Sequence, residues 1–133
     1  MKAIKANVTN GLQVGSLVET CDNSGAKIIK ITGVKRKKTV KGRVPGAGVG
    51  DMVVAAVKKG RHDMRKKVVY AIIVRQRKEY KRPDGTRVTF EDNAAVVLKD
   101  EKGNPKGTIF KGPIAKEAAG RWPGVAKVAN MVI

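Results

Sequence analysis

The sequence has one cysteine, Cys21, and one histidine, His62. Its aromatic residues, Phe, Trp and Tyr, make up only 4% of the chain. A lone cysteine cannot form an internal disulfide, and a lone histidine without further cysteine or histidine ligands cannot anchor a zinc site. Cysteine usage of this kind suits a reducing cytosol. The scarcity of aromatic side chains argues against a protein that binds single-stranded nucleic acid by base stacking.

Hydrophobic segments of membrane length are also missing. The apolar run at residues 68–74 is too short for a membrane span and too rich in β-branched residues to favour a helix. The first eleven residues lack the hydrophobic centre of a signal peptide, and no long basic amphipathic helix is evident. We therefore expect no membrane partner, and a chain of 133 residues predicts a single domain with a modest core.

Acidic residues are scarce compared with basic ones. The chain has 29 Lys and Arg against 11 Asp and Glu, for a formal charge of +18. Such an excess destabilises a compact isolated protein by self-repulsion, so it predicts a polyanionic partner, and nucleic acid is favoured over a membrane. The alternative is a solvated charged surface without a partner, which the size of the excess makes a poor explanation.

Residues 68–74 begin the segment around which the chain is organised. This apolar run predicts a core strand, and a basic segment follows at 75–82. Residues 83–85, Pro-Asp-Gly, predict a turn, because proline presets φ and glycine tolerates positive φ. A second strand with alternating apolar residues follows at 87–90, and the chain returns to the interior at 94–98. We expect two core strands that project a basic β-hairpin from the body of the domain.

Three more segments read as strands, at 17–21, 27–38 and 52–57, and residues 22–25 form a turn after the first. Five or six short strands, without a helix in the first hundred residues, predict a small closed barrel. Closure also removes open sheet edges that would otherwise favour aggregation. The fold class expected is therefore mainly β.

The pattern changes near residue 100. A turn or hairpin tip is expected at 100–105, a short helix at 114–119, and a second short helix beginning at Trp122 and Pro123. Helices this short must pack on the barrel or on a partner to be stable. The predicted organisation is a β-barrel with basic loops over 1–99, and a C-terminal hairpin with two short helices over 100–133.

Basic residues form three clusters, at 35–43, 58–67 and 75–82. Strand ends gather at the rims of a barrel, so these separate clusters can merge into one surface, where lysines and arginines would neutralise phosphates. The residues expected to bind nucleic acid are Lys35, Arg36, Lys37, Lys38, Lys41, Arg43, Lys58, Lys59, Arg61, Arg65, Arg75, Arg77, Lys78, Lys81 and Arg82.

No combination of residues predicts an enzyme, a metal or a cofactor. Cys21 reads as a small buried hydrophobe, because the only candidate base, His62, is distant and reads as a surface residue. Glu91 and Asp92 are adjacent on a strand and therefore point to opposite faces, which is unsuitable for a catalytic acid pair. The glycine-rich segment 46–50 lacks the Lys-Ser/Thr ending of a P-loop and does not lead into a helix. Its glycines allow a tight turn or a close approach to RNA.

Trp122, the only tryptophan, lies beside Arg121 at the junction of the two predicted helices. Two interpretations are open. The side chain covers the end of the barrel, or it anchors a partner, because tryptophan and arginine are favoured at the centres of interfaces.

Beyond these arguments, the sequence resembles ribosomal protein family fourteen of the large subunit. The family pattern is a small residue and three aliphatics, a basic spacer, Asp-Gly, an aromatic residue, Asn, and then Val with an aliphatic. It corresponds here to residues 71–74, 75–83, 84–85, Phe90, Asn93 and 96–97, and agreement extends to 22–26, 47–51 and 112–117. Residues 74–78 and 90–95, with the longer N-terminus, resemble the archaeal and eukaryotic branch.

The resemblance implies a five-stranded barrel with a projecting β-ribbon and a short C-terminal helical region. It implies a cytoplasmic protein of the large ribosomal subunit, bound to large-subunit rRNA and lying at the intersubunit face. Implied partners are large-subunit protein three, a small neighbouring protein, small-subunit rRNA across a bridge, and an anti-association factor, without a small-molecule substrate. The alternative is a free single-strand RNA-binding barrel protein, which the scarcity of aromatic residues disfavours.

Overall fold

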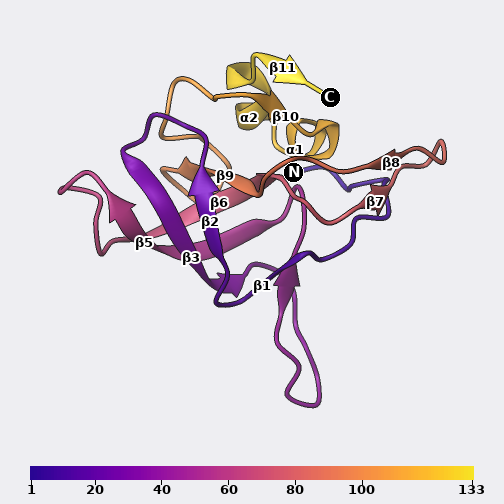
Figure 1. Cartoon of the computed structure of the whole chain (residues 1–133), viewed down its shortest axis with the longest axis horizontal. Coiled ribbons are helices and arrows are strands. Elements are labelled where there is room, and N and C mark those ends of the chain that lie inside the picture. The colour runs from indigo at the N-terminus through magenta and orange to yellow at the C-terminus, as the bar shows by residue number, and fades with distance from the viewer.

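A computed structural model describes residues 1–133 and has a closed barrel of five strands at its centre. Neighbouring strands are antiparallel, except that β2 and β9 close the barrel in parallel. The prediction of a small closed five-stranded barrel is therefore confirmed. The barrel strands are β2 (Leu17–Thr20), β3 (Ala26–Val34), β5 (Met52–Gly60), β6 (Val68–Arg75) and β9 (Ala94–Leu98) (Figure 1).

Side-chain alternation places the barrel core. In β3, Ile29 and Ile31 are fully buried, whereas Lys30 faces solvent. Strand β6 behaves differently, because Ile73 lies in the barrel interior while its neighbour Ile72, on the outer face, is also fully buried. A strand covered on both faces reads as a continuous apolar run. This double burial explains why residues 71–74 show no polar alternation.

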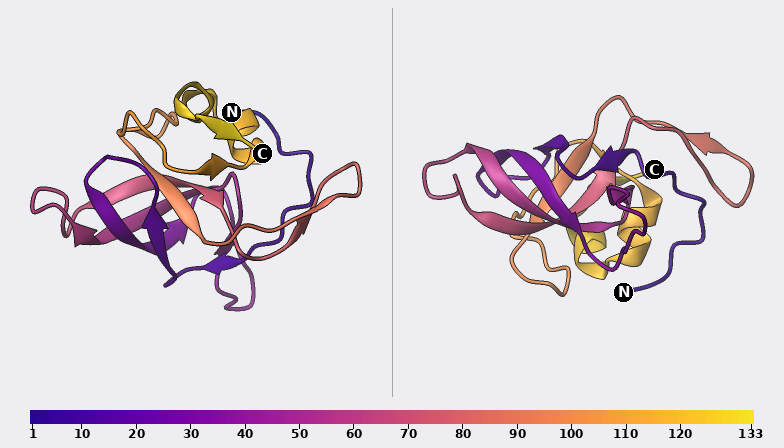
Figure 2. Two further views of the ribbon diagram at one scale, coloured as in Figure 1. Left: turned by 45° about the horizontal axis from the view of Figure 1, so that its top comes forward. Right: turned by 90° about the horizontal axis from the view of Figure 1, so that it is seen from below.

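The C-terminal region covers the outer face of β6 and β9 and builds a second core there. In Figure 2 this region lies stacked on one side of the barrel. Its packing residues include Phe110, Ile114 and Trp122, which join Ile72 and Val96 in one buried cluster. The elements are β10 (Pro113–Ile114), α1 (Lys116–Arg121), α2 (Pro123–Val128) and β11 (Met131–Val132).

Two short helices were expected, and two are present, but the first begins later than predicted. Ile114 belongs to β10, which pairs in parallel with β11. The Ile133 N–H donates to the Ile114 carbonyl at 2.9 Å, and the Lys116 N–H donates to the Ile133 carbonyl at 2.8 Å. This pairing with the chain end keeps residue 114 extended. Neither helix is long and apolar enough to cross a membrane.

The projecting hairpin is present as β7 (Tyr80–Lys81) and β8 (Arg87–Val88), which pair in antiparallel fashion. Its tip is closed by the Arg82 N–H, which donates to the Thr86 carbonyl at 2.8 Å, and Gly85 takes a φ of 91° there. The hairpin extends well beyond the barrel (Figure 1). The predicted turn residues therefore have the expected role.

Strand β3 ends at Val34, earlier than the expected position near residue 38. Arg36 has a φ of 63°, so the chain leaves the extended conformation at that point. It returns through β4 (Gly46–Ala47), which pairs with β1 (Leu12–Gln13). This small sheet was not predicted, because two-residue strands leave no periodic pattern. It closes the base of a long loop between β3 and β4.

Candidate nucleic-acid interface

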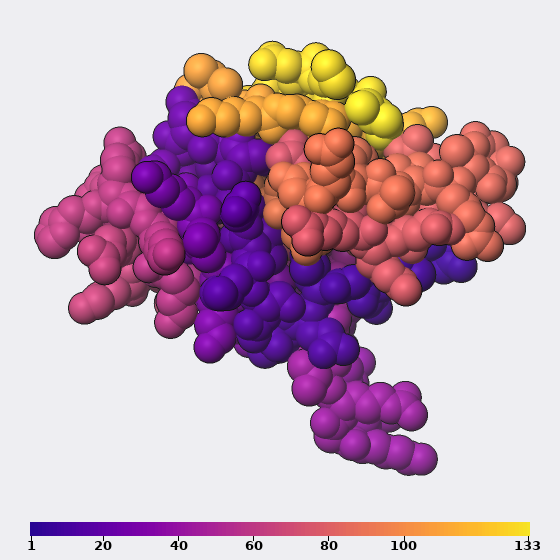
Figure 3. Space-filling model, viewed as in Figure 1, coloured from indigo at the N-terminus to yellow at the C-terminus, as the bar shows by residue number.

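The three basic clusters lie on three separate projections of the molecule. These are the 35–45 loop between β3 and β4, the 58–67 hairpin between β5 and β6, and the 75–90 ribbon that contains β7 and β8. In Figures 1 and 3 they extend from different sides of the body. The basic segments therefore extend past the rims of the barrel on separate projections, and their merging into one surface stays a prediction.

Most of the expected binding residues face solvent on these projections. Three of the remaining expected residues, Lys35, Lys37 and Arg82, are partly buried, and Arg75 is buried. The solvent-exposed residues are Arg36, Lys38, Lys41, Arg43, Lys58, Lys59, Arg61, Arg65, Arg77, Lys78 and Lys81.

Internal ion pairs neutralise the base of the 35–45 loop. Lys37 Nζ lies 2.7 Å from Asp51 Oδ2 and 2.7 Å from Asn10 Oδ1. Lys35 Nζ lies 3.5 Å from Glu101 Oε1 and 5.1 Å from the centre of the Tyr70 ring. These two lysines hold the loop on the body, so the charges free for a polyanion lie further out.

The 58–67 hairpin has an anchored arginine and a group of free lysines. Arg61 Nη2 donates to the Ser24 carbonyl at 3.1 Å, and its Nε lies 3.6 Å from Asp63 Oδ1. Lys66 and Lys67 were left out of the expected residues although they continue the same basic run, and both are exposed. The sequence signal that could have identified them is the run itself.

Arg75 was expected to bind nucleic acid, and its position contradicts this. The side chain is buried, with Nε 2.9 Å from Asp92 Oδ1 and Nη2 3.2 Å from Asp92 Oδ2. Its Nη1 donates to the carbonyls of Lys111 and Pro113 at 2.9 and 2.8 Å. Each of these three nitrogens therefore has a partner within the chain. Arg75 joins the end of β6 to the C-terminal region and is not available to a phosphate.

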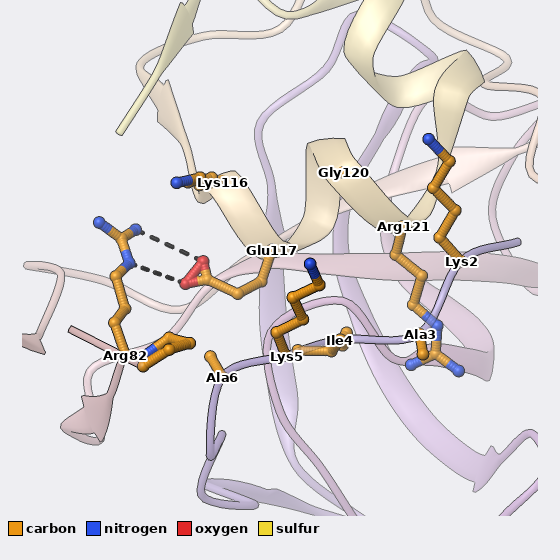
Figure 4. Close-up of a pocket in the computed structure, with 11 residues that line it drawn as sticks. Lys2, Ala3, Ile4, Lys5, Ala6, Arg82, Lys116, Glu117, Gly120 and Arg121 are labelled. Atoms are coloured by element: carbon orange, nitrogen blue, oxygen red, sulfur yellow. Dashed lines mark hydrogen bonds and ion pairs between the residues drawn. The ribbon is translucent and has the colours of Figure 1, made fainter. Parts of the chain in front are cut away.

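Arg82, another residue expected to bind nucleic acid, is partly buried and has partners within the chain (Figure 4). Its Nε and Nη2 lie 2.9 and 3.4 Å from the two carboxylate oxygens of Glu117, and Nη2 also donates to the Ile133 carbonyl at 2.6 Å. The hydrogen bond to Glu117 is the main reason that the pKa of Arg82 is raised. This pair fastens the ribbon to α1. Tyr80 is buried nearby, and burial raises the pKa of its hydroxyl to about 12.

We expect Arg75→Ala to lower the free energy of unfolding by about 2–3 kcal/mol, because Asp92 and two carbonyls lose their donors. Denaturant unfolding of the purified chain measures this. Lys78→Ala, an exposed change on the same ribbon, is the control and is expected to stay within about 0.5 kcal/mol of the wild type. An Arg75→Ala variant of unchanged stability, with a reduced salt dependence of RNA binding, would instead make Arg75 a phosphate contact.

Trp122 is 5% exposed and belongs to the second core, where its Nε1–H donates to the Gly50 carbonyl at 2.8 Å. Arg121 lies against it, 5.7 Å from the ring centre, and its Nη1 is 3.3 Å from Asp51 Oδ1. The structure therefore favours the interpretation in which Trp122 covers the barrel. Its burial disfavours a role as a partner anchor, and the partner role expected of Trp122 and Arg121 stays a prediction.

The glycine-rich segment 46–50 serves the fold. The Gly48 N–H donates to Asp51 Oδ2 at 2.8 Å, and the Val49 N–H donates to Gln76 Oε1 at 2.9 Å. A side chain at Gly48 would meet the Thr9 carbonyl at 2.7 Å, so only glycine allows this approach. These backbone donors face the chain itself and cannot bind a phosphate or RNA. Sequence reasoning missed Gln76, a fully buried amide, because it lies within a basic run.

The remaining polar candidates do not form a catalytic group. Cys21 is buried, and burial raises the pKa of its thiol to about 11, so the thiol stays protonated. The neighbouring Asp22 accepts the Val97 N–H at 2.9 Å, and burial raises its pKa as well. No three His, Cys, Asp or Glu side chains converge to hold a metal ion.

Comparison with known proteins found a matching family and close relatives over the full chain. The family model described as ribosomal protein L14p/L23e matches residues 11–133. A protein of Picrophilus torridus named large ribosomal subunit protein uL14 is 50% identical over 133 residues, which is the full length of both chains. Its namesake in Nanoarchaeum equitans is 48% identical over the same length. The resemblance seen in the sequence is confirmed, and the chain belongs to the ribosomal protein L14p/L23e family.

Proposed function

We propose that this chain is a structural component of the large ribosomal subunit in the cytoplasm, where it binds large-subunit rRNA. The observation that carries the proposal is the set of exposed basic side chains on three projections, on a member of a ribosomal protein family. Lysine and arginine at such positions neutralise phosphates without reading sequence. An rRNA that folds around the protein would reach all three projections.

The family resemblance also supports a place at the intersubunit face. We propose that the C-terminal region contributes to a bridge with small-subunit rRNA and to the docking of an anti-association factor, with large-subunit protein three as a neighbour. Met131, Val132 and Ile133 support a contact there, because these consecutive apolar residues are about half exposed. In Figure 1 they lie on the side of the barrel opposite the 35–45 loop.

The alternative, a free protein that binds single-stranded RNA, requires aromatic side chains on the surface. Tyr80, Phe110 and Trp122 are buried, and Tyr70 and Phe90 are only partly accessible on different elements. The structure therefore offers no stacking platform. Sedimentation through a salt gradient distinguishes the two functions, because a ribosomal protein stays with large subunits through moderate salt and a free binder does not.

We expect the combined change Lys38→Ala, Lys41→Asn and Arg43→Ala to weaken binding to large-subunit rRNA. The slope of log affinity against log salt should flatten by roughly 0.7–0.9 for each phosphate that the variant no longer neutralises. Asparagine is used at residue 41 because Lys41 has a φ of 58°, which asparagine tolerates. Binding measured at several salt concentrations tests this prediction.

The matched control removes the same charge elsewhere, at Lys99, Lys102 and Lys127, which are exposed in the C-terminal third of the chain. It is expected to leave the slope nearly unchanged. Equal slopes for the wild type and the loop variant would remove the 35–45 loop from the RNA-binding surface.

A further inference from the structure

The tip of the 35–45 loop combines positive charge with unusual apolar exposure. Val40 and Val44 are 68% and 54% exposed, although they lie on a protein whose other valines are mostly buried or partly buried. Lys38, Lys41 and Arg43 alternate with them, and no acidic residue occurs between positions 35 and 50. The tip extends away from the body (Figure 3).

The tip has a defined backbone conformation. The Arg43 N–H donates to the Val40 carbonyl at 3.3 Å, and the Thr39 hydroxyl donates to the Arg43 carbonyl at 2.6 Å. The two central residues, Lys41 and Gly42, have φ values of 58° and 71°, as in a type I′ turn. These bonds define the backbone between the flanking residues, so little backbone ordering is needed when a partner binds.

The base of the loop is attached to the body. Gly46 and Ala47 pair with β1, and the Val14 N–H donates to the Pro45 carbonyl at 3.1 Å. The ion pair between Lys37 and Asp51 holds the other side of the base. The body therefore supports the loop up to these residues, whereas the two valines beyond them face solvent.

The chemistry of the tip defines its partner. Three cations favour an anionic partner, and the two exposed aliphatic side chains among them would gain from an apolar surface between the anionic groups. RNA has this combination, since base faces and riboses lie between phosphates. In a regular RNA duplex the major groove is too narrow for side chains, so bases become accessible in loops and bulges. Aliphatic side chains can insert between bases where stacking is interrupted.

We propose that Val40 and Val44 contact unstacked bases in a loop or bulge of large-subunit rRNA, while Lys38, Lys41 and Arg43 bind the flanking phosphates. This inference rests on the proposed function and adds to it a contact with bases. An acidic protein surface is a different class of partner, and crosslinking in assembled subunits distinguishes it from RNA.

The test compares wild-type protein with the double variant Val40→Ser and Val44→Ser in binding to isolated large-subunit rRNA at several salt concentrations. Removing two apolar side chains from the bases is expected to weaken binding by roughly tenfold. The salt slope should stay unchanged, because no charge is removed. Leu17→Ser, at a similarly exposed position on the barrel, is the control and should bind as the wild type does.

Chemical probing of the bases gives a second measurement. Bases protected by the wild-type protein should become reactive with the valine variant, while backbone protections from the lysines persist. Wild-type affinity of the valine variant would overturn the proposal, and so would crosslinks from residue 40 to a protein in assembled large subunits. The combined change Lys38→Ala, Lys41→Asn and Arg43→Ala, called here the basic-tip variant, separates the two proposals. If it flattens the slope while the valine variant binds normally, only the base contact fails. An unchanged slope in the basic-tip variant contradicts the RNA-binding role of this loop, and the base contact with it.

Discussion

Trp122→Ala should lower the free energy of unfolding by about 3–5 kcal/mol, the usual cost of truncating a large buried aromatic side chain. The indole lies in the second core between the C-terminal helices and β6. Its surroundings cannot collapse easily, because the ring lies against the backbone of Gly103, where a side chain would come within 2.6 Å of it. Denaturant unfolding of the isolated chain measures this effect.

Trp122→Phe separates packing from hydrogen bonding at this position. It keeps most of the apolar contact but removes the Nε1–H donor to the Gly50 carbonyl. The Gly50 carbonyl is then left without this donor, so we expect the free energy of unfolding to fall by about 1–3 kcal/mol, less than in the alanine variant.

A partner anchor would behave differently. Its removal would leave stability unchanged and cost about 2 kcal/mol or more in partner binding. Large subunits that carry Trp122→Phe or Arg121→Ala, with normal incorporation confirmed, should therefore be assayed for joining to small subunits and for factor binding. A normal unfolding curve for Trp122→Ala together with defective joining would contradict its assignment to the core.

Ile72→Ala and Ile73→Ala should each lower the free energy of unfolding by about 2–5 kcal/mol. The sequence alone predicts an effect for at least one of them, because a barrel strand turns alternate residues outward. The structure predicts an effect for both, since each is fully buried. Ile73 packs in the barrel interior, and Ile72 packs beneath the C-terminal helices.

Val68→Ala is the control on the same strand. Val68 lies at the exposed beginning of β6, so its substitution should change stability by no more than about 0.5 kcal/mol. A silent Ile72→Ala beside a destabilising Ile73→Ala would mean that the C-terminal region does not pack on β6. Two silent substitutions would contradict the barrel placement of the strand.

Local sequence patterns predicted most of the barrel strands. Alternation in β3, the apolar runs of β5, β6 and β9, and the Pro-Asp-Gly turn are properties of neighbouring residues, so they can be read without a structure. The family motifs likewise lie within short segments. Strand pairing between segments that are distant in sequence could not be predicted in this way. An example is β10, whose parallel partner β11 lies at the end of the chain.

The charge excess and its polyanionic partner are also properties of the sequence, but which cations are free was decided only by the tertiary structure. Arg75 and Lys38 look alike in a basic run. Folding brings Asp92 and two carbonyls to Arg75, whereas Lys38 stays exposed to solvent. Trp122 similarly meets Gly50, 72 positions away. Sequence determines the number and the local order of charged and apolar groups. Burial and ion pairing depend on distances between segments that only the folded chain brings together.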